Sequence, residues 1–299
     1  MSRLYILLPL GAAFLIAGVT YVAHLHGAAI PVLQPHGAIA LAERRVMYLT
    51  LALCAIVVVP VYAMLFDFAW AFRERNPGAR AAHHPTWDHS TTLAEIVWWV
   101  VPSIIIAILA ILAWTSSHQL DPYKPLGTPG NTLEVEVVAL QWKWLFIYPQ
   151  LGIASVNHLE LPAKVPVRFE ITADAPMNSL WIPSLGGQIM AMPGMETQLN
   201  LVADDPGEYD GFSGNISGTG FSSMTFKVDA VPQSAFIAWA LSVANGTSTL
   251  DASAYASLAA PAVVAAPFSY AAVDSQLYTS IMTSYMAPKA AAGGGMTMP

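Results

Sequence analysis

The sequence predicts two membrane-spanning helices, then an all-β domain, then a small helical extension at the C-terminus. Hydrophobic residues make up 55% of the 299-residue chain and charged residues only 10%, with a mean hydropathy of +0.52. This composition is typical of a membrane protein. Two nearly uncharged runs are long enough to cross a bilayer. Beyond them, short segments that alternate apolar and polar residues indicate the strands of a β-sandwich or barrel.

The two apolar runs predict a helical hairpin within residues 34–118. We expect the first helix at about 47–70 and the second at about 96–117. Each is close to the roughly 20 residues that cross the hydrocarbon core. Trp98 and Trp114 lie near the two ends of the second helix, as is common at membrane interfaces.

Charge predicts the orientation of the hairpin. The loop between the helices carries three arginines, Arg73, Arg75 and Arg80. Basic loops favour the cytoplasmic side, so the long C-terminal part is expected on the outer side. From residue 119 onward the chain holds six Lys or Arg against fourteen Asp or Glu. This acidic balance argues against nucleic acid as a partner.

Residues 1–33 form a third apolar stretch that fits two descriptions. Arg3 followed by the apolar run Leu4–Val22 has the charge and length of a secretory signal peptide. The same run is long enough to be an additional transmembrane helix that is retained. The residues leave both alternatives open.

A linker rich in proline and glycine, residues 119–130, precedes the predicted β domain at 131–230. The segments with strand-like composition are Thr132–Ala139, Gln141–Tyr148, Val165–Thr172, Glu196–Ala203 and Met224–Ala230. Short strands at this spacing fit a Greek-key sandwich. The second segment places aromatic residues at alternate positions, from Trp142 to Tyr148, and we expect them in the core or on a packed face.

Residues 231–299 are rich in alanine and form the predicted extension. Helices are expected at Gln233–Ala244, Ala252–Leu258 and Ser275–Met286. The last ten residues, which contain three consecutive glycines, are expected to be a flexible tail.

The stretch from Ser213 to Met224 has the length of a copper-binding loop but lacks the donors. An electron-transfer copper site needs thiolate and imidazole ligands. The single cysteine, Cys54, lies inside the first predicted helix, and His158 is the single histidine from residue 119 onward. We therefore expect no metal and no catalytic residue in the β domain.

This loop resembles the metal loop of subunit II of the haem–copper oxidases, Cys-x-Glu-x-Cys-x-x-x-His-x-x-Met. A further histidine of that family precedes a run ending in Pro-Ser-Leu-Gly, which residues 179–186 match. The copper-ligand positions here, called the frame positions below, hold Asn178, Ser213, Asn215, Ser217, Phe221 and Met224. Met224 alone is of a ligand type. Subunit II without copper resembles the ubiquinol-oxidising, cytochrome bo-type branch of the family.

The resemblance covers roughly residues 35–285 and implies a cupredoxin-like fold for the β domain. It implies a proton-translocating terminal oxidase that oxidises ubiquinol and reduces dioxygen to water. The haems and CuB would belong to subunit I, and this chain would bind no cofactor. Subunits I, III and IV and the lipid bilayer are the implied partners, and cytochrome c is not. The implied location is the bacterial inner (plasma) membrane, multi-pass, with the C-terminal domain in the periplasm.

Glu95 is the strongest candidate for a functional side chain. It lies in Leu-Ala-Glu-Ile-Val-Trp-Trp-Val-Val-Pro, where the second helix enters the membrane from the predicted cytoplasmic side. In the family, the glutamate of this motif lies at the entrance of the K proton pathway into subunit I. The structural alternative is a carboxylate that stabilises a helix N-terminus through the macrodipole.

A second function class remains open, namely a membrane-tethered cupredoxin-like binding or assembly module outside any oxidase. A cytochrome c oxidase subunit is disfavoured because the copper ligands are absent. Two further polar groups have poor metal-site spacing and are expected to be solvated. They are His83, His84, Asp88 and His89 in the loop of the hairpin, and Asp204, Asp205, Glu208 and Asp210 around a predicted turn.

Overall fold

The computed structural model describes residues 21, 30–73, 89–127 and 130–286. These residues form two compact units. The first is helical and runs up to Leu120, apart from residues 34–43. The second combines residues 34–43 with the chain from Asp121 onward.

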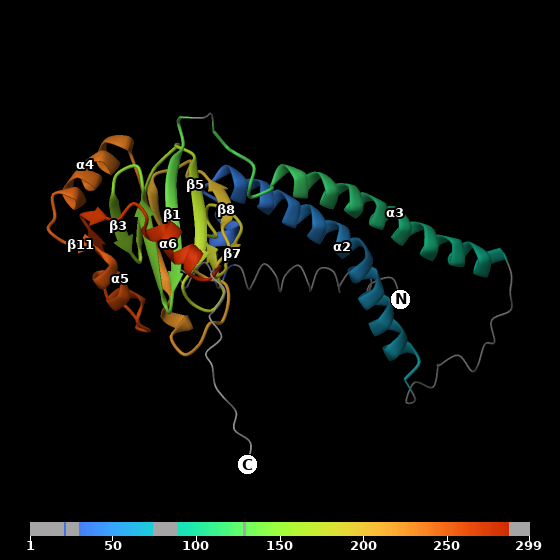
Figure 1. The fold of residues 1–299 in the computed structure, drawn as a ribbon. Helices are drawn as coiled ribbons and strands as arrows, with labels where there is room; N and C mark the ends of the chain where they lie inside the picture. The colour runs from blue at the N-terminus through green and yellow to red at the C-terminus, as the bar shows by residue number, and fades with distance from the viewer. Residues whose placement is uncertain (1–20, 22–29, 74–88, 128–129, 287–299) are drawn as a thin grey trace, which may run out of the picture. The chain divides into compact units, whose positions relative to one another are not determined.

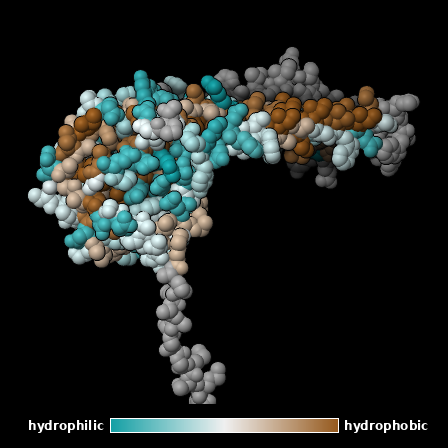
Figure 2. Space-filling model, turned by 45° about the horizontal axis from the view of Figure 1, so that its top comes forward, coloured by the Kyte–Doolittle hydropathy of each residue, from teal (hydrophilic) through white to brown (hydrophobic). Residues whose placement is uncertain are grey.

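The helical unit is built from two long apolar helices, α2 (Ala38–Ala71) and α3 (His89–Gln119), after a short 3-10 turn, η1 (Pro31–Leu33). The most apolar parts of α2 and α3 have mean hydropathies of 2.5 and 2.7. Figure 2 shows apolar side chains gathered along these helices. Length and composition therefore suit both helices to cross a membrane.

Both helices are longer than the sequence predicts. α2 begins at Ala38 instead of near residue 47, and α3 begins at His89 instead of near residue 96. At 1.5 Å per residue, α2 is about 51 Å long, well beyond the roughly 30 Å of a hydrocarbon core. The apolar run locates the part that crosses the membrane, whereas the helix itself continues into more polar sequence.

The β domain is a sandwich of two sheets (Figure 1). The larger sheet has the strand order β12-β3-β2-β1-β5-β8 and the smaller has the order β4-β10-β9-β6-β7. The strands of the larger sheet are β1 (Leu133–Leu140), β2 (Lys143–Tyr148), β3 (Ile153–Val156), β5 (Val167–Ala173), β8 (Thr197–Leu201) and β12 (Phe268–Tyr270). Those of the smaller sheet are β4 (His158–Pro162), β6 (Asn178–Trp181), β7 (Ile189–Ala191), β9 (Gly207–Ser213) and β10 (Thr225–Val231).

Strands that are distant in sequence become neighbours in both sheets. β1 runs parallel to β5, and β4 runs parallel to β10, whereas the other pairs in the two sheets are antiparallel. Such non-consecutive pairing is expected of a Greek-key sandwich. The predicted fold class is therefore confirmed, with a cupredoxin-like β domain after two apolar helices.

The core lies between the two sheets, and aromatic rings fill much of it. Trp144, Phe146 and Tyr148 of β2 are fully buried there, which confirms the prediction of an aromatic core. Trp142 differs, because it stands in the turn before β2 with a φ of 69°. Phe226 of β10 meets Trp144 edge-on, with ring centroids 5.8 Å apart.

The C-terminal extension contains strands as well as helices. The three predicted helices are present as α4 (Gln233–Ala244), α5 (Ala252–Ala259) and α6 (Leu277–Ser284). Between them lie β11 (Thr249–Leu250), β12 and β13 (Ala272–Val273), and β12 adds an edge strand to the larger sheet. The predicted helical extension is confirmed, and it also contains short strands, because the backbone of 268–270 pairs with the free edge of β3.

This extension covers the second face of the larger sheet. Leu250, Leu258 and Ile281 pack against Leu145 and Ile147 of β2 in a second hydrophobic core. β2 is thus buried on both faces, which explains why all six of its residues are buried. Hydrogen bonds also hold the extension against the β domain. The Nζ of Lys143 donates to the Ala260 carbonyl at 2.8 Å. The hydroxyls of Tyr255 and Tyr285 both donate to the Asp174 carboxylate at 2.6 Å.

Candidate functional site

The frame positions lie at one end of the smaller sheet. The loop from Ser213 to Met224 joins the end of β9 to the start of β10, with a 3-10 turn, η2 (Phe221–Ser223), inside it. Asn178 begins β6, which pairs with β9 through Leu180 and Ser213. The sheet therefore brings Asn178 beside Ser213 although they are 35 residues apart in sequence.

Asn178 and Ser213 form a buried hydrogen-bonded pair. The Ser213 hydroxyl donates to Asn178 Oδ1 at 3.0 Å, and Asn178 Nδ2 donates to the Pro176 carbonyl at 2.7 Å. The backbone N–H of Asn215 donates to Ser213 Oγ at 3.4 Å. Buried polar groups are stable only when they are paired in this way. Neutral hydroxyl and amide groups thus satisfy one another at the positions where the family resemblance implies copper ligands.

The second half of the loop is held by Trp142. Its indole N–H donates to the Ser217 carbonyl at 3.2 Å. The ring also lies against Gly220, where an added Cβ would stand 2.3 Å from a ring carbon. The buried Ser217 hydroxyl has no hydrogen-bond partner within the described residues. Trp142 therefore fixes the loop by packing, a contact that no local sequence pattern indicates.

The donor set at the frame positions does not fit copper. Met224 is fully buried and contributes its backbone carbonyl to the N–H of Ser213 at 3.2 Å. The amide of Asn215 lies 4.0 Å from the sulfur of Met190. Hydroxyls, amides, a phenyl ring and thioethers replace the thiolates and imidazoles that bind copper tightly. A mixed-valence copper pair has no suitable ligands in this loop.

The Pro-Ser-Leu-Gly run beside the frame positions has a structural task. The N–H of His36 donates to the Ser184 carbonyl at 2.7 Å, and the N–H of Ala40 donates to the Leu185 carbonyl at 3.2 Å. A Cβ at Gly37 would stand 2.6 Å from the Val202 carbonyl. This close backbone approach holds residues 34–43 against the β domain.

Glu95 stands at the seventh position of α3 and is partly buried. The helix begins at His89, so Glu95 lies in the second turn. Because the macrodipole acts mainly within the first turn, it gives Glu95 little stabilisation. The structural alternative, a carboxylate kept to stabilise the helix N-terminus, is therefore weaker than the sequence alone indicated.

The two further polar groups noted in the sequence are not part of the frame positions. One lies largely outside the described residues, and the other lies on and near strand β9. His83, His84 and Asp88 lie outside the described residues, as does the side chain of His89. Glu208 and Asp210 belong to strand β9 instead of a turn, and both carboxylates pair with the Nζ of Lys227, at 2.7 and 2.8 Å. Asp205 lies 3.6 Å from the imidazole of His36.

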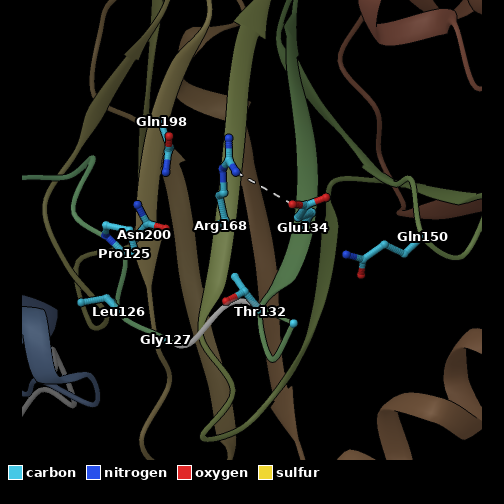
Figure 3. A pocket seen from close by; sticks show the side chains of 10 residues that line it. Pro125, Leu126, Gly127, Thr132, Glu134, Gln150, Arg168, Gln198 and Asn200 are labelled. Atoms are coloured by element: carbon cyan, nitrogen blue, oxygen red, sulfur yellow. Dashed lines mark ion pairs between the residues drawn. The ribbon is translucent and has the colours of Figure 1, made fainter.

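An open groove of about 780 Å³ lies on the outer face of the larger sheet (Figure 3). Arg168, Glu134, Gln198 and Asn200 line it, together with the linker residues that precede β1. Arg168 is engaged, because its guanidinium lies 2.6 Å from Glu170 and 3.9 Å from Glu134. The lining contains no imidazole, thiol or paired nucleophile, so the groove carries no evident chemistry.

One polar cluster in the β domain was not predicted from the sequence. His158, Glu160 and Asp229 offer ligand atoms that all lie within 4.8 Å of one another. The alternation His-Leu-Glu was visible in the sequence, but Asp229 is 71 residues from His158 and joins the cluster only through the pairing of β10 with β4.

Known proteins resemble this chain over most of its length. Residues 150–231 match the family described as cytochrome c oxidase subunit II, periplasmic domain, and residues 245–289 match the COX aromatic rich motif. Cytochrome bo(3) ubiquinol oxidase subunit 2 of Pseudomonas aeruginosa is 41% identical over 261 residues, covering 87% of this chain and 78% of that protein. Ubiquinol oxidase subunit 2 of Acetobacter aceti is 43% identical over 263 residues, covering 87% and 84%. The chain belongs to the family of ubiquinol oxidase subunit 2 proteins.

Proposed function

We propose that this chain is subunit II of a proton-translocating terminal ubiquinol oxidase of the haem–copper type. The complex oxidises ubiquinol, reduces dioxygen to water and moves protons across the bacterial inner membrane. The observation that carries this proposal is the conjunction of family membership with the hydrogen-bonded Asn178–Ser213 pair at copper-ligand positions. A subunit that received electrons from cytochrome c would need copper there.

Electrons enter this oxidase without passing through the present chain. The haems and CuB reside in subunit I, which also oxidises ubiquinol, and this subunit contributes no redox cofactor. Its two helices pack against subunit I within the bilayer, and its β domain lies on the periplasmic side. Subunits III and IV complete the assembly, and cytochrome c is not a partner. The two long apolar helices and the match to a periplasmic domain family support this placement.

Glu95 provides the entrance of a proton pathway on the cytoplasmic side. Its carboxylate stands beyond the first turn of α3, where the macrodipole gives it little stabilisation. Glu95 lies at the edge of the apolar span, where a carboxylate can meet both water and the membrane, as the entrance of a proton pathway requires. These facts support a proton role over a purely structural one.

Exchange of this carboxylate tests the role. Glu95→Ala and Glu95→Gln in the intact complex should lower ubiquinol-driven oxygen consumption about 10-fold or more, in line with typical losses when a proton-transfer group is removed. Glu95→Asp should restore much of the rate. Asp121→Asn, which removes a carboxylate just beyond the opposite end of α3, is the matched control and should leave the rate unchanged. Full turnover and proton pumping in Glu95→Ala would refute the role.

Co-purification tests the assembly itself. An affinity tag on this chain should retrieve a multi-helix subunit with haem absorption and ubiquinol oxidase activity. The alternative of a tethered module without an oxidase lacks support, because relatives that match 87% of the chain are named as oxidase subunits. Recovery of the chain without any haem protein from membranes that retain oxidase activity would favour that alternative.

A further inference from the structure

We propose that His158, Glu160 and Asp229 form a binding site for a zinc-type divalent cation on the outer face of the smaller sheet. These three residues are called the His158 cluster. The site is separate from the frame positions and adds no redox centre, because zinc does not change its oxidation state. The proposal goes beyond the oxidase function and does not depend on it.

The backbone holds the three ligands on one face of two paired strands. In the parallel register of β4 and β10, Glu160 stands opposite Asp229, and His158 stands opposite Lys227. Side chains two residues apart on a strand point to the same face, so His158 and Glu160 share the face of Asp229. The hydroxyl of Ser155 donates to the His158 carbonyl, which fixes the start of β4. The ligands are thus placed by sheet structure and not by a flexible loop.

The distances suit a tetrahedral ion. His158 Nε2 lies 3.0 Å from Asp229 Oδ2 and 3.4 Å from Glu160 Oε2. Ligand bonds of about 2.0–2.2 Å in a tetrahedral zinc site place two ligand atoms about 3.3–3.6 Å apart. The two distances from His158 Nε2 therefore need to change only by a few tenths of an ångström, and the ligand atoms of Glu160 and Asp229 lie within 4.8 Å of each other. A water molecule would complete the four ligands.

Charge also favours a cation. Nε2 of an imidazole carries at most one proton, whereas two carboxylates face it here. The neighbouring ammonium of Lys227 is engaged by Glu208 and Asp210. Within the described part of the chain, the ion pairs of Glu160 and Asp229 are both with His158. A divalent ion would neutralise both carboxylates together.

Burial of the cluster is graded, so an ion can enter from solvent and then be held. The side chains of Glu160, His158 and Asp229 are 9%, 22% and 37% exposed. Trp239 of α4 meets the imidazole of His158 nearly at right angles, with ring centroids 6.2 Å apart, which restricts the orientation of the ring. One nitrogen and two oxygens favour zinc over calcium, which takes six to eight oxygen ligands.

Zinc titration of the full-length chain in detergent tests the site. The wild-type chain should bind one more Zn²⁺ ion than His158→Gln, because other histidines contribute the same background to both. Asp229→Asn, at the most exposed ligand, should weaken this extra ion at least about 100-fold, beyond the 10- to 100-fold loss typical of outer-shell changes. Glu208→Gln removes a carboxylate from the same sheet face outside the cluster and is the matched control.

A second readout reports the ligands directly. Co²⁺ bound at the extra site should give visible absorption bands typical of four or five ligands, and these bands should vanish in His158→Gln but persist in Glu208→Gln. An excess of Ca²⁺ or Mg²⁺ should not displace the ion. Equal Zn²⁺ stoichiometry in the wild-type chain, His158→Gln and Asp229→Asn would overturn the proposal, as would displacement by Ca²⁺. Neither readout measures oxidase turnover, so the test stands apart from the oxidase proposal.

Discussion

The β domain contains two polar clusters, the frame positions and the His158 cluster. The first has the sequence pattern of a metal site without its donors, and the second has suitable donors without such a pattern. The frame positions have the loop length and strand arrangement of a copper site but hold amides, hydroxyls and a phenyl ring. The His158 cluster has imidazole and carboxylate donors at suitable distances without any recognisable spacing in sequence. The comparison teaches that loop length preserves a fold, whereas the donor atoms decide the chemistry.

The largest expected effect comes from returning donors to the frame positions. Restoring the family pattern requires the substitutions Asn178→His, Ser213→Cys, Asn215→Glu, Ser217→Cys and Phe221→His. Copper bound by the full-length chain should rise from background to stoichiometric, because thiolate and imidazole would occupy positions that the sheet already brings together. Metal analysis and visible absorption measure the gain.

The same variant without the two cysteines is the control for that gain. It should gain no stable copper, since imidazole and carboxylate alone lack the bridging sulfur. If the variant with all five substitutions folds but binds no copper, the loop has lost the geometry of the site along with its donors.

A smaller effect is expected from disturbing the contact between Trp142 and Gly220 in the loop from Ser213 to Met224. Gly220→Ala would place a methyl group 2.3 Å from a carbon of the Trp142 ring and should lower the free energy of unfolding by about 2 kcal/mol. Gly214→Ala is the matched control, because its Cβ would meet the end of the flexible Gln188 side chain and, at 3.2 Å, the Ser179 hydroxyl instead of a ring. Urea unfolding followed by tryptophan fluorescence compares them, and equal stability would contradict the proposed packing.

Removal of the Ser213 hydroxyl should cost less still. Ser213→Ala leaves Asn178 Oδ1 buried without its donor, so the free energy of unfolding should fall by about 1 kcal/mol. Ser222→Ala, in the exposed turn of the same loop, should have no measurable effect. Ubiquinol oxidase activity should be unchanged in both variants. A strong loss of activity in Ser213→Ala would mean that this pair does more than fill the former ligand positions.

A further effect, which depends on pH, concerns a third group of carboxylates that contains no imidazole. Burial, with the nearby charges of Glu170, Glu196 and Glu134, raises the pKa of Glu136 to about 7 from its usual 4.5. The folded chain therefore binds a proton that the unfolded chain releases between these pH values. This contribution to stability is complete below about pH 4.5 and is lost as the pH rises through about 7.

Glu136→Gln should reduce the loss of stability that accompanies rising pH. The free energy of unfolding should fall less between pH 5 and pH 8 in Glu136→Gln than in the wild-type chain. Glu134→Gln, at the neighbouring outward position of β1, should change the pH dependence less. Identical pH profiles for Glu136→Gln and the wild-type chain would show that Glu136 does not titrate in this range.

Much of the fold follows from local sequence. Strand β1 was predicted because Val135 and Val137 alternate with outward carboxylates, and α4 was predicted because its apolar residues recur at helical spacing. β3 was missed because it is short and buried on both faces, so it shows no alternation, and β4 was missed because its alternation spans only five residues. The start of α2 was missed because the apolar run begins several residues after the helix does.

The site was only partly predictable for the same physical reason. The frame positions could be placed because a loop of fixed length joins two strands. The contact of Trp142 with the loop and the His158 cluster both join residues more than 70 positions apart, which local periodicity does not record. Register is set by burial across the whole sheet and must be seen in three dimensions.

The most direct test of the central claim is to offer the purified complex two electron donors in turn and to measure oxygen consumption. The claim is that electrons reach the oxidase without a copper centre in this chain. Ubiquinol should support rapid oxygen consumption, reduced cytochrome c should support none, and metal analysis should assign no copper to this subunit. Oxygen consumption driven by cytochrome c, with copper bound at the frame positions, would contradict the account.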